Sequence, residues 1–420
     1  MNLLVLCPHY SPDTAPTGEV MTSIGTELAA RGHQLHVVTS LPWYRDHAIE
    51  PGWGGRLVRH EDVPWGRITR VHPFPTDKTN IPARAAAFAG FTMLSATVAV
   101  LARGPVDGVL AMSPPLTLGL AGWAAAARRR VPFVFNIQDV FPDAAVETGA
   151  ITNPTIIRAA SRLERFTYRR ADAVTVLSDD LRDNVAAKLV GHRPERVRVI
   201  PNFVDTERIK PVDRDNAYRA EYGLRGKRVV MYAGNVGFSQ SLDLVLSAAA
   251  ALAHEPDIVF VINGGGSARV DLERQAAGLA NVVFVDAQPR ERLPELLAAA
   301  DVHVVPLKQG LARSSVPSKM YSILAAGRPI VASVDPGTEV ANVVERARAG
   351  VAVAPDDAEA FTKAIAGLVA DPAEMDRMGD AGRRFIESWA SPAAVAERYE
   401  LLFDELAAAG RRFGRGPRSK

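Results

Sequence analysis

Cysteine is almost absent from this chain of 420 residues, and several other features that mark a class of protein are missing as well. Cys7 is the only cysteine, so a disulfide framework is excluded and a reducing compartment is expected. The 49 Lys and Arg are nearly balanced by 47 Asp and Glu, a composition that does not indicate nucleic-acid binding. No basic segment precedes the first apolar residues. We therefore expect no signal peptide and predict a cytoplasmic location.

What is present fits two α/β domains of ordinary size, since 47% of the residues are apolar and 23% are charged. Apolar runs of strand length alternate with helical patterns through both halves, which favours a doubly wound sheet in each. The boundary is expected between residues 190 and 215. The expected strands are 2–7, 33–39, 106–111, 132–137, 173–177 and 197–200 in the first half, and 228–232, 258–262, 282–285, 302–306, 329–333 and 350–353 in the second.

The most informative segment follows the expected strand at 302–306. A small-residue loop leads into a short helix from Ser318 to Ala326, with Ser318 as N-cap and Gly327 as the left-handed residue that ends the helix. The N-terminus of such a helix favours anions, and Lys319 adds a full positive charge there. Taken alone, this pattern is equally typical of an ordinary βαβ unit.

A second turn of the same kind shifts the balance toward a ligand site. Ala233 to Gly237 is rich in glycine, follows the strand at 228–232 and precedes a helical pattern. Two such turns in one half predict a ligand at the carboxyl ends of parallel strands. In the first half, Gly18 opens a helix after the first strand, and Asp139 and Asp143 follow the strand at 132–137. These positions are also typical of active-site groups in open α/β sheets.

One apolar segment, 85–102, has the length of a membrane-spanning helix and no charge, but it is diluted by seven alanines. We expect a buried or interfacial helix here. The stretch before it is basic, which would suit an anionic membrane surface. A solvated loop beside a core helix is the alternative interpretation of that stretch. Its charged residues are Arg56, Arg59, Arg67, Arg70 and Lys78, against Glu61, Asp62 and Asp77.

Phrases along most of the chain resemble a known family. They are CPHYSPDTAPTGE, RGHQLHVVTS, PPLTLGL, FNIQDVFPDAAVETG and IPNFVD in the first half, and YAGNVGFSQSLD, VINGGGSARVDLE, DVHVVPLKQG and VPSKMYSILAAGRPIVAS in the second. In their order and spacing they are similar to the retaining glycosyltransferases of family 4, and most to the bacterial colanic-acid and O-antigen branch that includes N-acetylfucosaminyltransferases.

The resemblance implies the GT-B fold, in which two Rossmann-like doubly wound domains face each other across a cleft. It implies an acceptor-binding domain at 1–200, a nucleotide-sugar-binding domain at 201–390 and a C-terminal helix at about 391–410 that returns to the first domain. Residues 411–420 are expected to form a disordered basic tail. No cofactor and no metal are expected. The implied partners are a UDP- or GDP-sugar and a glycan or polyprenyl-diphosphate-linked acceptor, with contact to the inner face of the membrane.

The family's motifs also predict the site residues, with three departures. Its Glu-x7-Glu pair falls on Ser314 and Ser322, with Glu339 as a possible substitute, and its basic diphosphate pair falls on Asn235 and Gln240. Asp139 takes the place of an acceptor-side histidine. The residues predicted to hold the donor are Gly18, Gly234, Asn235, Gly237, Gln240, Val316, Pro317, Ser318, Ser322 and Glu339, and those predicted to be catalytic are Asp139 and Lys319.

The expected reaction is sugar transfer with retention, in which helix-terminal N–H groups and Lys319 stabilise the leaving diphosphate. Asp139 would orient or deprotonate the acceptor, or would merely cap the turn before Pro142. Two alternatives are a nucleotide-sugar epimerase of the same fold and a non-catalytic nucleotide-sugar-binding protein. A dehydrogenase is disfavoured, because no G-x-G-x-x-G follows the first strand.

Overall fold

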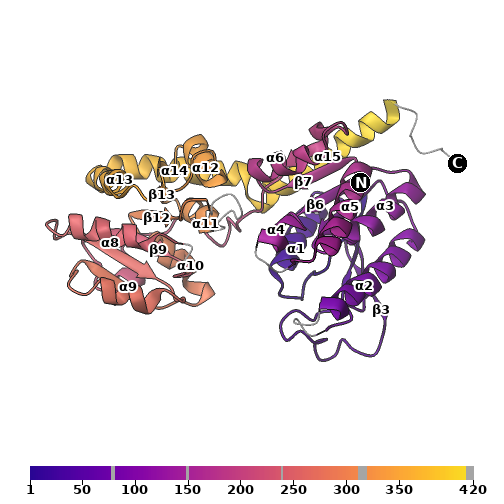
Figure 1. The fold of residues 1–420 in the computed structure, drawn as a ribbon, viewed down its shortest axis with the longest axis horizontal. Coiled ribbons are helices and arrows are strands. Elements are labelled where there is room, and N and C mark those ends of the chain that lie inside the picture. The colour runs from indigo at the N-terminus through magenta and orange to yellow at the C-terminus, as the bar shows by residue number, and fades with distance from the viewer. Residues whose placement is uncertain (77–80, 148–150, 238–239, 311–318, 413–420) are drawn as a thin grey trace. The chain divides into compact units, whose positions relative to one another are not determined.

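The chain forms two compact α/β units in the computed structural model, which describes residues 1–76, 81–147, 151–237, 240–310 and 319–412. The first unit comprises Met1–Asn202 and Pro392–Lys420, and the second comprises Phe203–Ser391. Each contains one sheet with helices on both faces (Figure 1). The expected fold class, two Rossmann-like domains, is confirmed.

The sheet of the first unit has eight strands in the order β3-β4-β2-β1-β5-β6-β7-β8. All neighbours are parallel except β3 and β4, which form an antiparallel pair. Its central strands are buried along their length because helices cover both faces. The strands are β1 Asn2–Leu6, β2 Gln34–Ser40, β3 Val58–Val63, β4 Gly66–Val71, β5 Gly108–Ser113, β6 Phe133–Ile137, β7 Ala173–Val176 and β8 Val197–Val199.

Helices connect these strands, and the last helix of the chain completes the unit. They are α1 Pro16–Ala30, α2 Ile81–Leu101, α3 Leu118–Arg129, α4 Asp143–Glu147, α5 Pro154–Arg170, α6 Asp179–Ala187, the 3₁₀ turn η1 Pro194–Arg196 and α15 Pro392–Arg412. On α15, Glu400 accepts from Arg31 at 2.7 Å and the buried Tyr399 hydroxyl accepts from Asn136 at 2.9 Å. These contacts attach α15 to the first unit. It continues two residues into the expected tail, and 413–420 lie outside the described residues.

The sheet of the second unit has six strands, all parallel, in the order β11-β10-β9-β12-β13-β14. The strands are β9 Arg228–Ala233, β10 Ile258–Asn263, β11 Val282–Val285, β12 Val302–Pro306, β13 Ile330–Ser333 and β14 Gly350–Val353. The helices are α7 Ala217–Glu221, α8 Leu242–Ala251, α9 Arg269–Gln275, the 3₁₀ turn η2 Arg290–Arg292, α10 Leu293–Ala298, α11 Lys319–Ala325, α12 Glu339–Ala347, α13 Ala358–Ala370 and α14 Pro372–Trp389.

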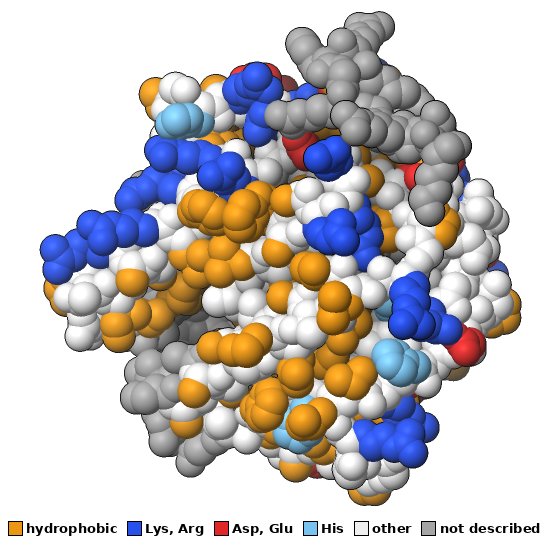
Figure 2. Space-filling model, turned by 90° about the vertical axis from the view of Figure 1, so that its right-hand side faces the viewer, with side chains coloured by type: hydrophobic (Ala, Val, Ile, Leu, Met, Phe, Trp, Pro, Cys, Tyr) orange, Lys and Arg blue, Asp and Glu red, His pale blue; other side chains and the backbone are white. Residues whose placement is uncertain are grey.

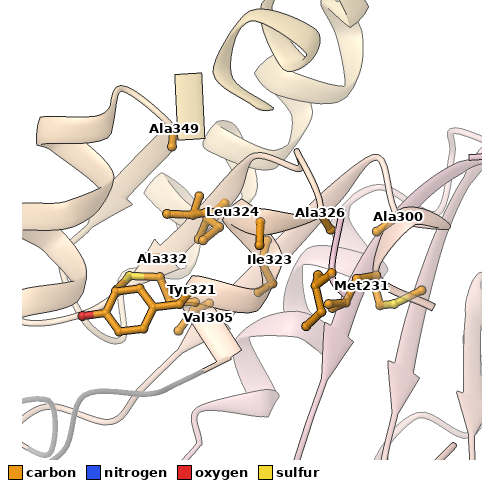
Figure 3. Close-up of a cluster of buried hydrophobic side chains, with 14 of the residues drawn as sticks. Met231, Ala300, Val305, Tyr321, Ile323, Leu324, Ala326, Ala332 and Ala349 are labelled. Carbon is orange, nitrogen blue, oxygen red and sulfur yellow. The ribbon is translucent and has the colours of Figure 1, made fainter. Parts of the chain in front are cut away.

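Helix α11 is held in place by the core on one face of this sheet. Its residues Ile323 and Leu324 lie among the apolar side chains of β9 and β12, such as Met231 and Val305 (Figure 3). Gly327 follows it with a φ of 69°, the left-handed conformation expected at that position. The start of α11 is therefore anchored by packing, and the first residue of the helix is Lys319.

The sequence-based interpretation of the basic stretch at 56–78 was wrong. Residues 58–71 form the hairpin of β3 and β4, and not a loop. Arg70 is 1% exposed and donates to Glu61 at 2.7 Å, while Arg67 donates to Asp62 at 2.8 Å. The period-2 signal was hidden because charged residues occupy both faces of these strands. Two of the five basic residues are thus already neutralised by partners.

The apolar segment at 85–102 forms most of α2, which packs against α3. Ala87, Phe91 and Ala99 are buried beneath it. In the part of the chain that the structure describes, no helix combines the length and apolarity needed to cross a bilayer. The helix is half-buried, with one face turned outward.

Candidate functional site

The second sheet changes its winding direction between β9 and β12, which are direct neighbours. From β9 the chain continues to β10 on one side, and from β12 it continues to β13 on the other. The helix after β9, α8, packs into one apolar core, and α11 packs into the core on the opposite face. Ligands of open α/β sheets bind where two such connections diverge, at the carboxyl ends of the strands.

Lys319 reaches this position, and three side-chain contacts define where its ammonium lies. Its Nζ donates to Oε1 of Gln240 at 3.0 Å and stands 4.2 Å from the ring centroid of Tyr232. A methyl group built on Gly234 would come within 3.6 Å of the same nitrogen. The structure thus brings together three residues that were predicted separately, and adds Tyr232.

Burial lowers the pKa of Lys319 to about 7, because a charge is poorly solvated in a largely apolar surrounding. In the described part of the chain the cation has an aromatic face and an amide as partners but no carboxylate. An anion such as a diphosphate would supply the missing counter-charge. Lys319 is therefore a cation prepared for an anionic ligand.

Two glycine-rich turns support each other at the same edge of the sheet. The N–H of Val236 donates to the carbonyl of Gly265 at 2.9 Å, and the N–H of Gly234 donates to the carbonyl of Asn263 at 3.0 Å. A Cβ on Gly264 would lie 1.9 Å from the carbonyl oxygen of Gly234. Only glycine permits this approach of two backbones. The turn after β9 is therefore rigidly placed by the turn after β10.

The details of the first turn correct one expectation. Helix α8 begins only at Leu242, so Asn235 does not lie at a helix N-terminus. Its carbonyl instead accepts from the Tyr232 hydroxyl at 2.6 Å, and its side chain lies 2.7 Å from the Cβ position of Gly237. The turn offers polar groups from Asn235 beside Lys319 without the helix-end charge that was predicted.

The remaining predicted donor residues have different outcomes. Ser322 is half-buried and follows Lys319 by three residues on α11, so both lie on one side of the helix. Glu339 is 1% exposed and its carboxylate lies 3.6 Å from Nη2 of Arg346. This burial argues against the expected contact with a ribose. Ser314, Val316, Pro317 and Ser318 lie outside the described residues.

In the first unit, Asp139 and Asp143 are separated by their surroundings. Asp143 accepts from Asn184 at 3.1 Å and lies 2.8 Å from Nζ of Lys188. That lysine also donates to the buried Glu164 at 2.6 Å, so Asp143 belongs to a structural ion-pair cluster. Asp139 has no such partner in the described chain, and burial raises the pKa of its carboxyl. Of the two carboxylates, Asp139 is the one suited to accept a proton.

Gly18 lies in α1 and its role differs from the one predicted. Its N–H donates to the carbonyl of Ala15 at 2.8 Å, so it is not a free donor for a phosphate. A Cβ on Gly18 would lie 2.9 Å from the Cβ of His9. The missing side chain makes room for His9, and any contact with a ligand stays a prediction.

Sequence reasoning missed Tyr232 and the Gly264–Gly266 turn as parts of the site. Tyr232 had the signature of a buried strand residue, and no local pattern shows that a ring lies beneath a lysine 87 positions further on. The three consecutive glycines were a usable signal, since they directly follow a strand. Among the described residues no cluster of His, Cys, Asp and Glu could hold a metal ion.

Comparison with family models matches both units. A model of the Glycosyl transferase 4-like domain matches residues 17–202, and a model of Glycosyl transferases group 1 matches residues 227–371. The chain is 28% identical over 376 residues to the putative colanic acid biosynthesis glycosyl transferase WcaI of Escherichia coli strain K12, covering 87% of this chain and 91% of that protein. It is 29% identical over 237 residues to the probable glycosyltransferase WbjE of Pseudomonas aeruginosa, covering 56% and 58%.

Solved structures share the fold. Sucrose-phosphate synthase from Thermosynechococcus elongatus superposes with a TM-score of 0.66 at 20% identity, covering 97% of this chain and 100% of that one. Anabaena HepE, solved in complex with UDP, has a TM-score of 0.64 at 15% identity with the same coverage. At these identities the likeness bears on the fold alone.

Proposed function

The chain is a two-domain glycosyltransferase, a Glycosyl transferase 4-like domain followed by a group 1 domain, and we propose that it uses a nucleotide-sugar donor. The acceptor is a glycan or a polyprenyl-diphosphate-linked glycan of a cell-surface polysaccharide. The similarity to the putative colanic acid biosynthesis transferase of E. coli supports the polysaccharide. The complex of HepE with UDP supports a nucleotide donor, here a UDP- or GDP-sugar.

The observation that carries this proposal is the position of Lys319. A largely buried ammonium at the carboxyl ends of β9 and β12, beside a turn without side chains, is built for a diphosphate. When the anomeric C–O bond of the donor breaks, its electron pair passes to the diphosphate. Lys319 stabilises that developing charge more strongly than water could, because few polar groups compete with it.

The acceptor oxygen forms the new bond to the anomeric carbon, and its proton passes to Asp139. The raised pKa of Asp139 makes it the stronger base of the two carboxylates in this loop. We propose that the anomeric configuration is retained and that no metal takes part, as in the family 4 enzymes that the motifs resemble. Gly234, Gly237, Asn235, Gln240 and Ser322 contribute donor contacts.

The function is tested with purified full-length protein and separate UDP- and GDP-sugars. We expect one of the two nucleoside diphosphates to stabilise the protein, by about 2.7 kcal/mol at 100 times its dissociation constant. The matching nucleotide sugar should be transferred to polyprenyl-diphosphate-linked N-acetylglucosamine or be slowly hydrolysed. Binding of neither diphosphate at 10 mM would refute the donor proposal. Binding without turnover would favour a non-catalytic protein, and conversion to an epimeric sugar would favour an epimerase.

We also propose that α2 and α3 of the first unit contact an anionic membrane. Apolar side chains project from one face of α2, where Phe88 is 36%, Met93 68% and Leu101 71% exposed. Between residues 78 and 138 the only acid is Asp107, whose carboxylate accepts from the N–H of Asn2. Figure 2 shows hydrophobic side chains bordered mainly by Lys and Arg. Such a surface suits acidic headgroups over an apolar layer.

The basic part of this surface differs from the one predicted. It is not the 56–78 stretch but the ends of α2 and α3, where Arg103, Arg128 and Arg130 are exposed. Arg129 joins the two helix ends by donating to the carbonyl of Ala102 at 2.7 Å. The basic groups therefore lie directly beside the apolar stripe of α2.

Charge reversal at Arg128→Glu and Arg130→Glu should weaken binding to vesicles of phosphatidylglycerol at least about tenfold, because each basic group near the surface adds about 1 kcal/mol. Co-sedimentation measures this, with phosphatidylcholine vesicles as the neutral comparison. Arg274→Glu, at an exposed position of α9, is the control and should bind like the wild type. Equal binding of all three proteins would contradict the membrane contact.

A further inference from the structure

Two loops of the first unit meet at the carboxyl ends of β1 and β2. These strands are parallel neighbours, so the residues that follow them lie at one edge of the sheet. The Ser40 hydroxyl at the end of β2 donates to the carbonyl of Pro8 at 2.6 Å. The two loops are thus fixed to each other before any side chain of a site is considered.

Asp13 completes this connection and sets the state of His9. Its side chain is fully buried. One carboxylate oxygen lies 2.7 Å from Nδ1 of His9, and the other accepts from the N–H of Tyr44 at 3.3 Å. Because the carboxylate can only accept, Nδ1 of His9 carries the hydrogen. Nε2 of the neutral ring is then a hydrogen-bond acceptor, and it has no partner in the described chain.

Aromatic rings surround His9 in a compact cluster. Trp43 stacks on it with ring centroids 5.7 Å apart and an angle of 28° between the planes, and Tyr44 meets it edge-on at 5.4 Å. His47 contacts both rings at 6.0 Å. Tyr44 is 39% exposed and Trp43 is partly exposed. A monomeric protein gains nothing by presenting such rings to water, so they indicate a binding surface.

The backbone of the loop gives a second indication. His47 has a φ of 51°, in the left-handed region that non-glycine residues rarely adopt. Such conformations persist where surrounding contacts enforce them, and they are common at binding sites. Gly18 serves the same arrangement, since any side chain there would displace His9.

We propose that His9, Trp43 and Tyr44 form a subsite for a pyranose ring of the acceptor. A pyranose combines an apolar C–H face with hydroxyl groups at its rim. The exposed aromatic rings can cover the face, and Nε2 of His9 can accept a hydrogen bond from a hydroxyl. Asp13 is a positioning residue, because it acts on the sugar only through His9 and the Tyr44 backbone. The inference rests on the proposed function and identifies the acceptor group as carbohydrate.

The subsite is tested by titrating the full-length protein, labelled with 5-fluorotryptophan, with methyl pyranosides of glucose, galactose, mannose, fucose and N-acetylglucosamine. The ¹⁹F resonance that disappears in Trp43→Phe identifies Trp43. We expect at least one pyranoside to shift this resonance. Uridine and guanosine are the comparison ligands. If no pyranoside shifts it up to 100 mM, or if a nucleoside shifts it at lower concentration, the subsite is not a carbohydrate site.

Variants separate the contributions of the residues. Trp43→Leu and Tyr44→Ala should each raise the acceptor KM in the transfer assay about tenfold and leave the affinity for the nucleoside diphosphate unchanged. Trp123→Leu, which removes a half-buried tryptophan of the same unit, should change neither. Unchanged acceptor KM in an active enzyme would sink the subsite while the proposed function stands. An enzyme that binds no nucleotide would refute the function, and the pyranoside titration remains decisive for the subsite.

Asp13→Asn tests the positioning role. An amide nitrogen can donate to Nδ1 of His9, so the hydrogen should move to Nε2 and pyranoside affinity should fall. The ¹⁵N chemical shifts of the His9 ring at pH 8 report the tautomer. A loss of affinity with the Nδ1–H form retained would show that Asp13 only holds the loops.

Discussion

Lys319→Met is expected to lower sugar transfer by at least about a hundredfold, while making the second unit more stable at pH 6. The loss of activity follows because the ammonium is the charged group beside the turn after β9, and removing one such group in a dry site commonly costs 10²–10³ in rate, roughly. The gain in stability follows because the same charge is costly to bury without an anion. Few substitutions would change activity and stability so strongly in opposite directions.

The sign of the pH dependence can be derived from the lowered pKa. The pKa of Lys319 is about 7 in the folded protein and about 10.5 in the unfolded chain. The penalty for its charge is fully present below pH 7 and disappears as the pH rises from 7 to 10.5. After the lost cation–π and Gln240 contacts are subtracted, Lys319→Met should gain on the order of 2 kcal/mol at pH 6 and little or nothing at pH 10.

Hydrogen exchange of peptides from β9 and β12 measures this gain within the second unit. Lys363→Met, at an exposed position of α13, is the matched control and should change neither exchange nor transfer. Binding of UDP or GDP to the wild type between pH 7 and 9 should take up protons, because the anion raises the pKa of Lys319. Calorimetry in buffers of different ionisation enthalpy detects this uptake. Uptake that persists in Lys319→Met would show that another group holds the diphosphate.

Gly264→Ala is expected to destabilise the second unit by about 2–4 kcal/mol and to abolish nucleotide binding. Its φ is 142°, and the new Cβ would lie 1.9 Å from the carbonyl oxygen of Gly234, so both backbone strain and a backbone collision contribute. The turn after β9 would have to move, and with it the surroundings of Lys319. Hydrogen exchange of β9 and β10 and titration with UDP and GDP measure the two effects.

The neighbouring glycine provides the control. A Cβ on Gly265 would meet no atom within 4 Å, and the residue has no left-handed φ. Gly265→Ala should therefore stay within about 0.5 kcal/mol of the wild type. If the two variants behave alike, the contact between the glycine turns does not hold the site together.

Much of the second unit could be predicted because its signals are local. Strands such as 228–232 and 302–306 are apolar runs bounded by glycine or proline, and parallel strands buried on both faces require such runs. Gly327 was interpretable for the same reason, since ending a helix in the left-handed conformation favours glycine. The β3–β4 hairpin was not predicted, because Glu61, Asp62, Arg67 and Arg70 conceal its alternation.

The sequence by itself determined that this protein has two doubly wound α/β halves and that Lys319 follows a strand of the second, because periodicity and turn residues are encoded within short segments. Only the tertiary structure decided that β9 and β12 are neighbours, and with that placed Gln240 and Tyr232 against Lys319. It also decided that Glu339 is buried and that His9 lies between Trp43 and Tyr44. These contacts depend on the order of strands in a sheet, which no local pattern specifies.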